Sequence, residues 1–219
     1  MLAAGTGGVI VGWLSCSSPR VCRWILAAGS QQPTWTGYPA RLGRATIVGG
    51  ATALVAVALL VCKRGVATAE VAGLVVWASA LAVLGLVDSR HFVVPTALVR
   101  LSALATGGFL LGAGGLSGDW QCVVGGVGCA LVAGGLFAVW AVAKPQGLGF
   151  GDVRMACLVA LGAGAICPAG AAVALSCAPL VAGVLSRHRA NTGARGAAPV
   201  PLGPLLAVGG IVAVVASAF

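Results

Sequence analysis

The sequence predicts an all-α, polytopic transmembrane protein, a bundle of about eight membrane-spanning helices with six as the lower bound. Hydrophobic residues make up 59% of the 219 residues, and the mean hydropathy is +1.06. Charged residues make up only 8%, whereas a soluble domain usually carries about 25%. The apolar residues also lie in long blocks, each near the roughly 17–25 residues that a helix needs to cross a bilayer core.

The apolar blocks and the polar residues between them place the spans in order along the chain. We expect spans at about residues 2–15, 44–62, 67–87, 94–116, 120–143, 152–166, 168–186 and 201–218. The block Met1–Leu14 lacks the basic residues that open a signal peptide, so we interpret it as a short first span. Residues 1–43 then form this span and a cytoplasmic loop, and residues 44–219 form the main transmembrane domain.

The basic residues are distributed unevenly among the predicted connections. The chain holds 13 Lys and Arg residues, and only Lys63 and Arg64 lie after the second, fourth or sixth span. The others, counting residues just inside the span ends, belong to the connections after the odd-numbered spans: Arg20, Arg23, Arg41, Arg44, Arg90, Arg100, Lys144, Arg154, Arg187, Arg189 and Arg195. Because cytoplasmic loops are enriched in Lys and Arg, we expect this second set to face the cytoplasm. Their isolated placement between apolar blocks argues against nucleic acid as a partner.

The four acidic residues divide between the two predicted membrane faces. Asp88 and Asp152 fall in cytoplasmic connections, whereas Glu70 and Asp119 fall on the opposite side. An ionised Asp in the middle of a bilayer costs roughly 2.5–3.5 kcal/mol, so two acids at one membrane edge need a physical explanation. Asp152 opens a predicted span, where the unpaired amides and the dipole of a helix stabilise a carboxylate.

Three interpretations of the aspartate pair follow from elementary chemistry. Ion pairs are one, because Arg90 lies close to Asp88 in sequence and Arg154 lies close to Asp152. Peptide hydrolysis is another, since two carboxylates that share a proton have separated pKa values, and one acts as acid and the other as base. A proton relay or cation site of a transporter is the third.

A G-x-G-D sequence surrounds the second aspartate and carries a family resemblance. It runs from Gly149 through Gly151 to Asp152, and Arg154 and Gly162 follow it. This pattern resembles the bacterial type IV prepilin peptidases, aspartic membrane proteases in which G-x-G-D supplies the second catalytic Asp. Its glycines leave room for a substrate backbone. The resemblance implies that Asp152 is catalytic and that the two glycines belong to the active-site motif.

Two further motifs extend the resemblance from about residue 38 to the C-terminus. The first catalytic Asp of that family is followed seven residues later by Pro, with aliphatic residues between, and Asp88 and Pro95 are similar. The family also has an aliphatic-Pro-x-Gly-Pro sequence entering the last span, which residues 200–204 match. The resemblance therefore implies that Asp88 is the catalytic partner of Asp152.

The chain departs from the longer family members in its first polar loop. Those proteins carry two C-x-x-C pairs there, associated with zinc and with N-methylation of the cleaved product, whereas residues 16–43 hold only Cys16 and Cys22. The spacing does not match a structural zinc site, so we expect no metal and no other cofactor. Thr96 and Arg154 replace an acid or Asn and a Lys of the family pattern.

The resemblance implies a membrane aspartic endopeptidase of the inner membrane whose active site faces the cytoplasm. Its expected partners are the bilayer and a prepilin or a prepilin-like pseudopilin, from which it removes the leader peptide; methyltransferase activity is not expected. Two alternatives stay open from the residues alone. One is a proton- or cation-coupled transporter, and the other is an inactive subunit of a pilus or secretion system.

Overall fold

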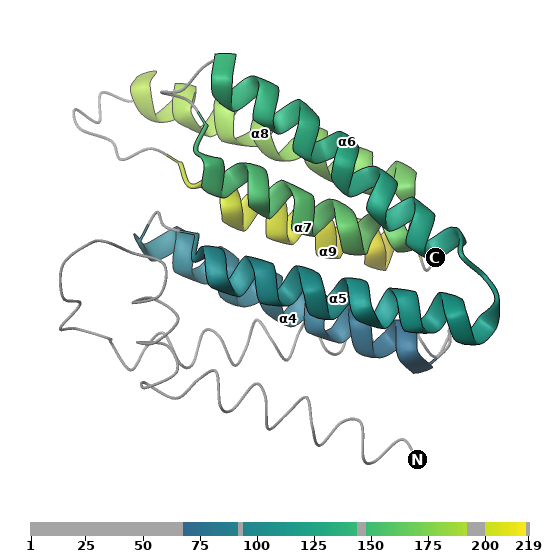
Figure 1. Ribbon diagram of the computed structural model, residues 1–219. Helices are drawn as coiled ribbons and strands as arrows, with labels where there is room; N and C mark the ends of the chain where they lie inside the picture. Colours follow the sequence, from purple (N-terminus) through teal and green to yellow (C-terminus); the bar gives the residue numbers. More distant parts are fainter. Residues whose placement is uncertain (1–67, 92–93, 144–147, 192–199, 218–219) are drawn as a thin grey trace, which may run out of the picture.

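The computed structural model describes residues 68–91, 94–143, 148–191 and 200–217, and within them every regular element is a helix. The helices are α4 (Thr68–His91), α5 (Thr96–Ser117), α6 (Gln121–Ala143), α7 (Phe150–Ile166), α8 (Pro168–Asn191) and α9 (Leu202–Ala216). They lie side by side, and helices that follow one another along the chain run in opposite directions (Figure 1). The all-α prediction is thus confirmed, while the expected spans at 2–15 and 44–62 lie outside the described residues.

Four of these helices, α4, α5, α6 and α8, are long and apolar enough to cross a membrane. Helix α7 has 17 residues and α9 has 15, so both are shorter than that length. Large apolar side chains are exposed along the outer faces of α6 and α8, among them Leu131, Leu136, Leu180 and Val184. Such faces are typical of helices that contact lipid, and the membrane class of the protein follows from them.

Helix α4 differs from the predicted span at its C-terminal end. The apolar block ends at residue 87, but the helix continues through the polar residues to His91. Asp88 therefore lies within the last turn of α4 rather than in a loop. The chain leaves the helical conformation before Pro95, because a residue that precedes proline is disfavoured in the α region. Helix α8 likewise continues past the predicted end at residue 186 to Asn191.

Trp77 joins three helices in the centre of the bundle. Its side chain is 0% exposed, and its indole N–H donates a hydrogen bond of 2.7 Å to the carbonyl of Leu158 in α7. Gly162, one turn further along α7, lies directly against the indole ring. From α9, Gly210 packs close to the same ring, where an added Cβ would be 3.5 Å from it. The absence of side chains at these glycines allows α4, α7 and α9 to pack around one aromatic ring.

Small residues also bring α6 against α7. A Cβ added at Gly125 would lie 2.7 Å from the carbonyl oxygen of Gly164, and one added at Gly126 would lie 2.6 Å from that of Leu161. Small residues permit close helix packing in membranes, where lipid provides no hydrophobic force between helices. Helix α6 therefore packs closely against α7, the helix that begins with the G-x-G-D motif and Asp152.

A tight turn between α5 and α6 reverses the direction of the chain, and α6 then runs back toward the end of the bundle where α5 began. Gly118 ends α5 in the left-handed conformation (φ 74°), and its N–H donates to the carbonyl of Gly114 at 2.9 Å. Asp119 then accepts a hydrogen bond of 2.9 Å from the N–H of Gln121, at the start of α6. The two crossings between Asp88 and Asp152 therefore form an antiparallel hairpin (Figure 1).

The contact between Gly162 and Trp77 generates a stability prediction. Gly162→Ala should lower the thermal midpoint of the detergent-solubilised protein, because the added methyl group overpacks the core; such changes cost about 1–3 kcal/mol. Gly135→Ala in α6 is the control, since nothing lies within 4 Å of its added Cβ. Equal midpoints for the two variants would contradict the close packing of α4 and α7.

Candidate active site

Asp88 is a buried acid in the last turn of α4. Its side chain is 6% exposed, and its Oδ2 accepts a hydrogen bond of 3.0 Å from the backbone N–H of Gly203. Gly203 is the second residue of α9, so this bond links the end of one helix to the start of another across 115 positions. The third motif of the sequence, residues 200–204, is thus in direct contact with the first aspartate.

Asp152 occupies the first turn of α7 and lies at the boundary between buried and exposed. Its Oδ2 accepts a hydrogen bond of 3.1 Å from the backbone N–H of Gly149, which is the N-cap residue of α7. This bond is one half of a capping box, so the predicted helix-capping role of Asp152 is confirmed. Burial raises the pKa of Asp152, and the hydrogen bond from Gly149 opposes that rise.

The two carboxylates come together at one end of the bundle. They are near enough for the negative charge of Asp152 to act on Asp88. The ion-pair alternative does not hold for Arg154: its guanidinium donates instead to the hydroxyl of Thr96, at 2.7 Å. The side chain of Arg90 lies outside the described residues. In the described part of the chain each carboxylate accepts one hydrogen bond, and both bonds come from the backbone.

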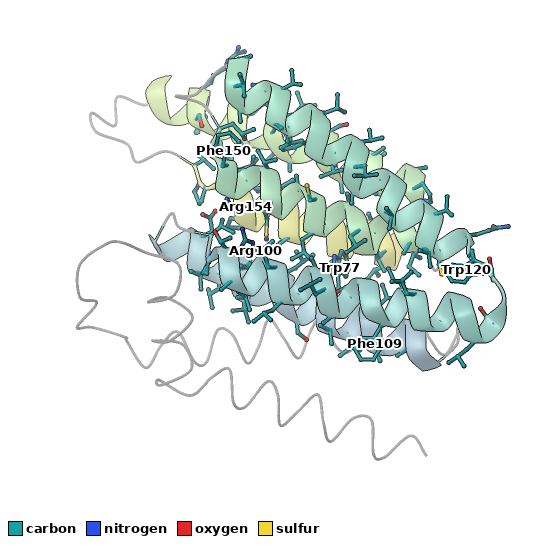
Figure 2. All side chains as sticks on the ribbon, in the orientation of Figure 1. Trp77, Arg100, Phe109, Trp120, Phe150 and Arg154 are labelled. Carbon is teal, nitrogen blue, oxygen red and sulfur yellow. The ribbon has the colours of Figure 1, made fainter. Side chains whose placement is uncertain are left out.

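The motifs around the two aspartates also touch each other. Gly151 packs against Val94, where an added Cβ would be 3.2 Å from the Cβ of Val94. The next residue, Pro95, is buried and forms the N-cap of α5. Figure 2 shows Arg154 of α7 and Arg100 of α5 at this same end of the bundle. Residues that are more than fifty positions apart in the sequence therefore form one cluster.

The remaining acids lie away from this cluster. Asp119 follows α5, whose 22 residues correspond to a length of about 33 Å, and it is exposed at the opposite end of the bundle. Glu70 belongs to the first turn of α4, which begins at that same opposite end. The predicted division of the four acids into two pairs on opposite sides is reproduced by the helix order.

Some interactions of the cluster were not foreseen from the sequence. The N–H of Gly203 and the hydroxyl of Thr96 are both partners that sequence reasoning missed. The P-x-G-P motif pointed to residues 200–204 through the family resemblance, but it did not indicate which atom contacts Asp88. Among the described residues, no three His, Cys, Asp or Glu side chains gather as a metal site would require. Cys16 and Cys22 lie outside those residues.

A search of protein-family models, of characterised proteins and of solved structures finds no match to this chain. The two carboxylates lie at one end of the bundle, each with a backbone donor, and the charge of Asp152 acts on Asp88. Two carboxylates that share one proton supply an acid and a base from identical residues.

The contact between the motifs can be tested by a disulfide. In a cysteine-free background, Val94→Cys with Gly151→Cys should form an intramolecular disulfide under mild oxidation, because the two Cβ atoms would lie 3.2 Å apart, slightly closer than the roughly 3.5–4.5 Å of native disulfides. Oxidised and reduced protein would be compared by gel mobility after cleavage of the chain between α5 and α7. Val94→Cys with Gly118→Cys, at opposite ends of α5, is the control and should remain reduced. Absence of the first disulfide would contradict the cluster.

Proposed function

We propose that this protein is a membrane aspartic endopeptidase that removes the leader peptide from prepilins or prepilin-like proteins at the cytoplasmic face of the inner membrane. The observation that carries this proposal is the meeting of Asp88 and Asp152 at one end of an apolar helix bundle. The order of the three motifs and their mutual contacts support the resemblance to type IV prepilin peptidases.

In the proposed reaction the two carboxylates share one proton. The ionised carboxylate takes a proton from water as the water oxygen attacks the carbonyl carbon of the scissile bond. The protonated carboxyl donates its proton to the carbonyl oxygen, which gives a tetrahedral intermediate. Proton transfer to the leaving nitrogen then breaks the C–N bond. Burial, which raises the pKa of Asp152, favours retention of a proton on this pair.

The position of the two acids favours peptide hydrolysis over transport. Both lie at helix ends, where extended segments lead into α5 and α7: the N-cap residues Pro95 and Gly149 have φ and ψ values in the extended region. A transporter typically binds its substrate near the middle of the membrane, between broken helices. Helices α4 to α7 are each continuous, and the centre of the bundle is filled by Trp77 and aliphatic side chains.

The charge distribution supports the proposed orientation. Arg100, Arg154 and Arg187 are exposed and belong to the end of the bundle that holds the two aspartates. The opposite turn carries Asp119 instead. Because basic residues favour the cytoplasmic side of a membrane, this arrangement supports an active site that faces the cytoplasm. The proposed enzyme is a short form that needs no zinc loop.

Replacement of either aspartate tests the proposed chemistry. Asp88→Asn and Asp152→Asn should each reduce cleavage of a co-expressed prepilin by about 10³-fold or more. Each variant leaves a single carboxylate opposite an amide, so no proton can be shared between two carboxylates. Cleavage is measured by the change in gel mobility of the prepilin. Asp119→Asn should cleave normally, and all three proteins should accumulate in the membrane. Normal cleavage by either active-site variant would exclude the dyad.

The proposed orientation is tested by labelling in intact cells. Cysteines introduced at exposed positions at the same end of the bundle as the dyad, Phe150→Cys and His188→Cys, should resist a membrane-impermeant thiol reagent in a cysteine-free background. Ser117→Cys, at the other end of the bundle, should react with it. All three should react after the membrane is permeabilised. Labelling of Phe150→Cys from outside would contradict a cytoplasmic active site.

A further inference from the structure

Asp88 is held by a residue that has no side chain. Gly203 provides the one hydrogen bond that this carboxylate accepts within the described residues, and it is itself buried. We propose that Gly203 is a positioning residue for Asp88: its backbone N–H orients the carboxylate, and its missing side chain provides the space that the carboxylate occupies. This inference rests on the proposed peptidase function, to which it adds a specific requirement at the start of α9.

The available space at Gly203 is occupied by the aspartate itself. An added Cβ would lie 2.5 Å from Oδ2, 2.9 Å from Cγ and 3.0 Å from Cβ of Asp88. These distances are too short for carbon and oxygen atoms that are not bonded. The carboxylate ends a side chain that can rotate, whereas both helix backbones are fixed by packing. A methyl group at position 203 would therefore displace mainly the carboxylate of Asp88, because the contact with the Cβ of Asp88, at 3.0 Å, requires a shift of only a few tenths of an ångström.

The donor is fixed in place by the packing of α9 on α4. A Cβ added at Gly85, one turn before Asp88, would lie 3.4 Å from the Cα of Pro204 and 3.2 Å from the Cβ of Ala207. The two backbones thus approach closely within about one turn of the hydrogen bond. Its geometry is set by two helices and does not depend on any side-chain rotamer except that of Asp88.

The N–H of Gly203 is also a donor without another partner within its own helix. The first four N–H groups of any α-helix lack intrahelical acceptors. At the start of α9 the N-cap residue is Pro201, which makes no side-chain hydrogen bond to the first turn. The carboxylate of Asp88, which belongs to α4, accepts the hydrogen bond that an N-cap side chain would otherwise accept from the first turn of α9. Because donation to a carboxylate favours its charged form, the same bond tunes the ionisation of Asp88.

The test compares two glycine substitutions in the same helix. Gly203→Ala should lower kcat by about 10- to 100-fold through misplacement of Asp88, with KM and the thermal midpoint unchanged. The limb of the pH–rate profile that reports ionisation of the dyad should move to higher pH. Gly209→Ala is the matched control, because its added Cβ would lie 3.5–3.6 Å from atoms of Ala174, an ordinary contact distance. It should leave kcat and the pH profile unchanged.

A second measurement is independent of peptidase activity. In an Asp152→Asn background, difference infrared titration against the Asp88→Asn, Asp152→Asn double variant follows the ionisation of Asp88 alone. Gly203→Ala should shift that titration to higher pH, and Gly209→Ala should not. An unshifted titration, or a thermal midpoint lowered in Gly203→Ala alone, would overturn the positioning role. Normal prepilin cleavage by Asp88→Asn would instead overturn the proposed function and leave the infrared result valid.

Discussion

The need to accommodate two negative charges at the end of an apolar bundle governs this structure. Each charge is met by a backbone N–H at the start of a helix: Gly203, in the first turn of α9, donates to Asp88, and Gly149, the N-cap of α7, donates to Asp152. A helix start is suited to this purpose because its first N–H groups have no partners within the helix and its dipole favours negative charge. Arg154, the nearest basic residue in sequence to Asp152, is engaged by Thr96. The charges of the two carboxylates therefore remain available to act on each other.

The arrangement of the helices follows from that need. Donors at helix starts can reach Asp88 only if α4 is packed closely against α9, and the two carboxylates can meet only if α7 lies beside both. Trp77 provides this alignment, since its ring contacts α9 at Gly210 and α7 at Gly162, and its N–H binds α7 at Leu158. The centre of the bundle, about 16 Å from Asp88 along α4, thus controls the geometry of its end.

The sequence predicted the helices better than it predicted their contacts. Long apolar blocks and the breakers between them are local signals, so residues 94–116 and 120–143 were placed within two residues of α5 and α6. The extension of α4 to His91 was missed, because polar residues at a helix end carry no apolar signal. The partner of Arg154 could not be decided from the sequence, since the choice between Thr96 and an aspartate depends on how α5 packs against α7. The grouping of Asp88 with Asp152 was predicted from loop charge and crossing number, which do not require knowledge of packing.

The backbone origin of both donors has a consequence for how the protein tolerates mutation. A side-chain substitution can remove an arginine or a serine that binds a carboxylate, but only proline removes a main-chain N–H. The bonds to Asp88 and Asp152 are therefore insensitive to the chemical character of the residues that supply them, and sensitive to their size. At position 203 the limit is strict, because any Cβ meets Asp88; at position 149 an added Cβ would lie 3.6 Å from Oδ2 of Asp152, so the limit is looser. Substitutions at position 203 should accordingly be limited by side-chain volume, whereas at position 149, where the backbone is extended, the main exclusion is proline, which removes the N–H.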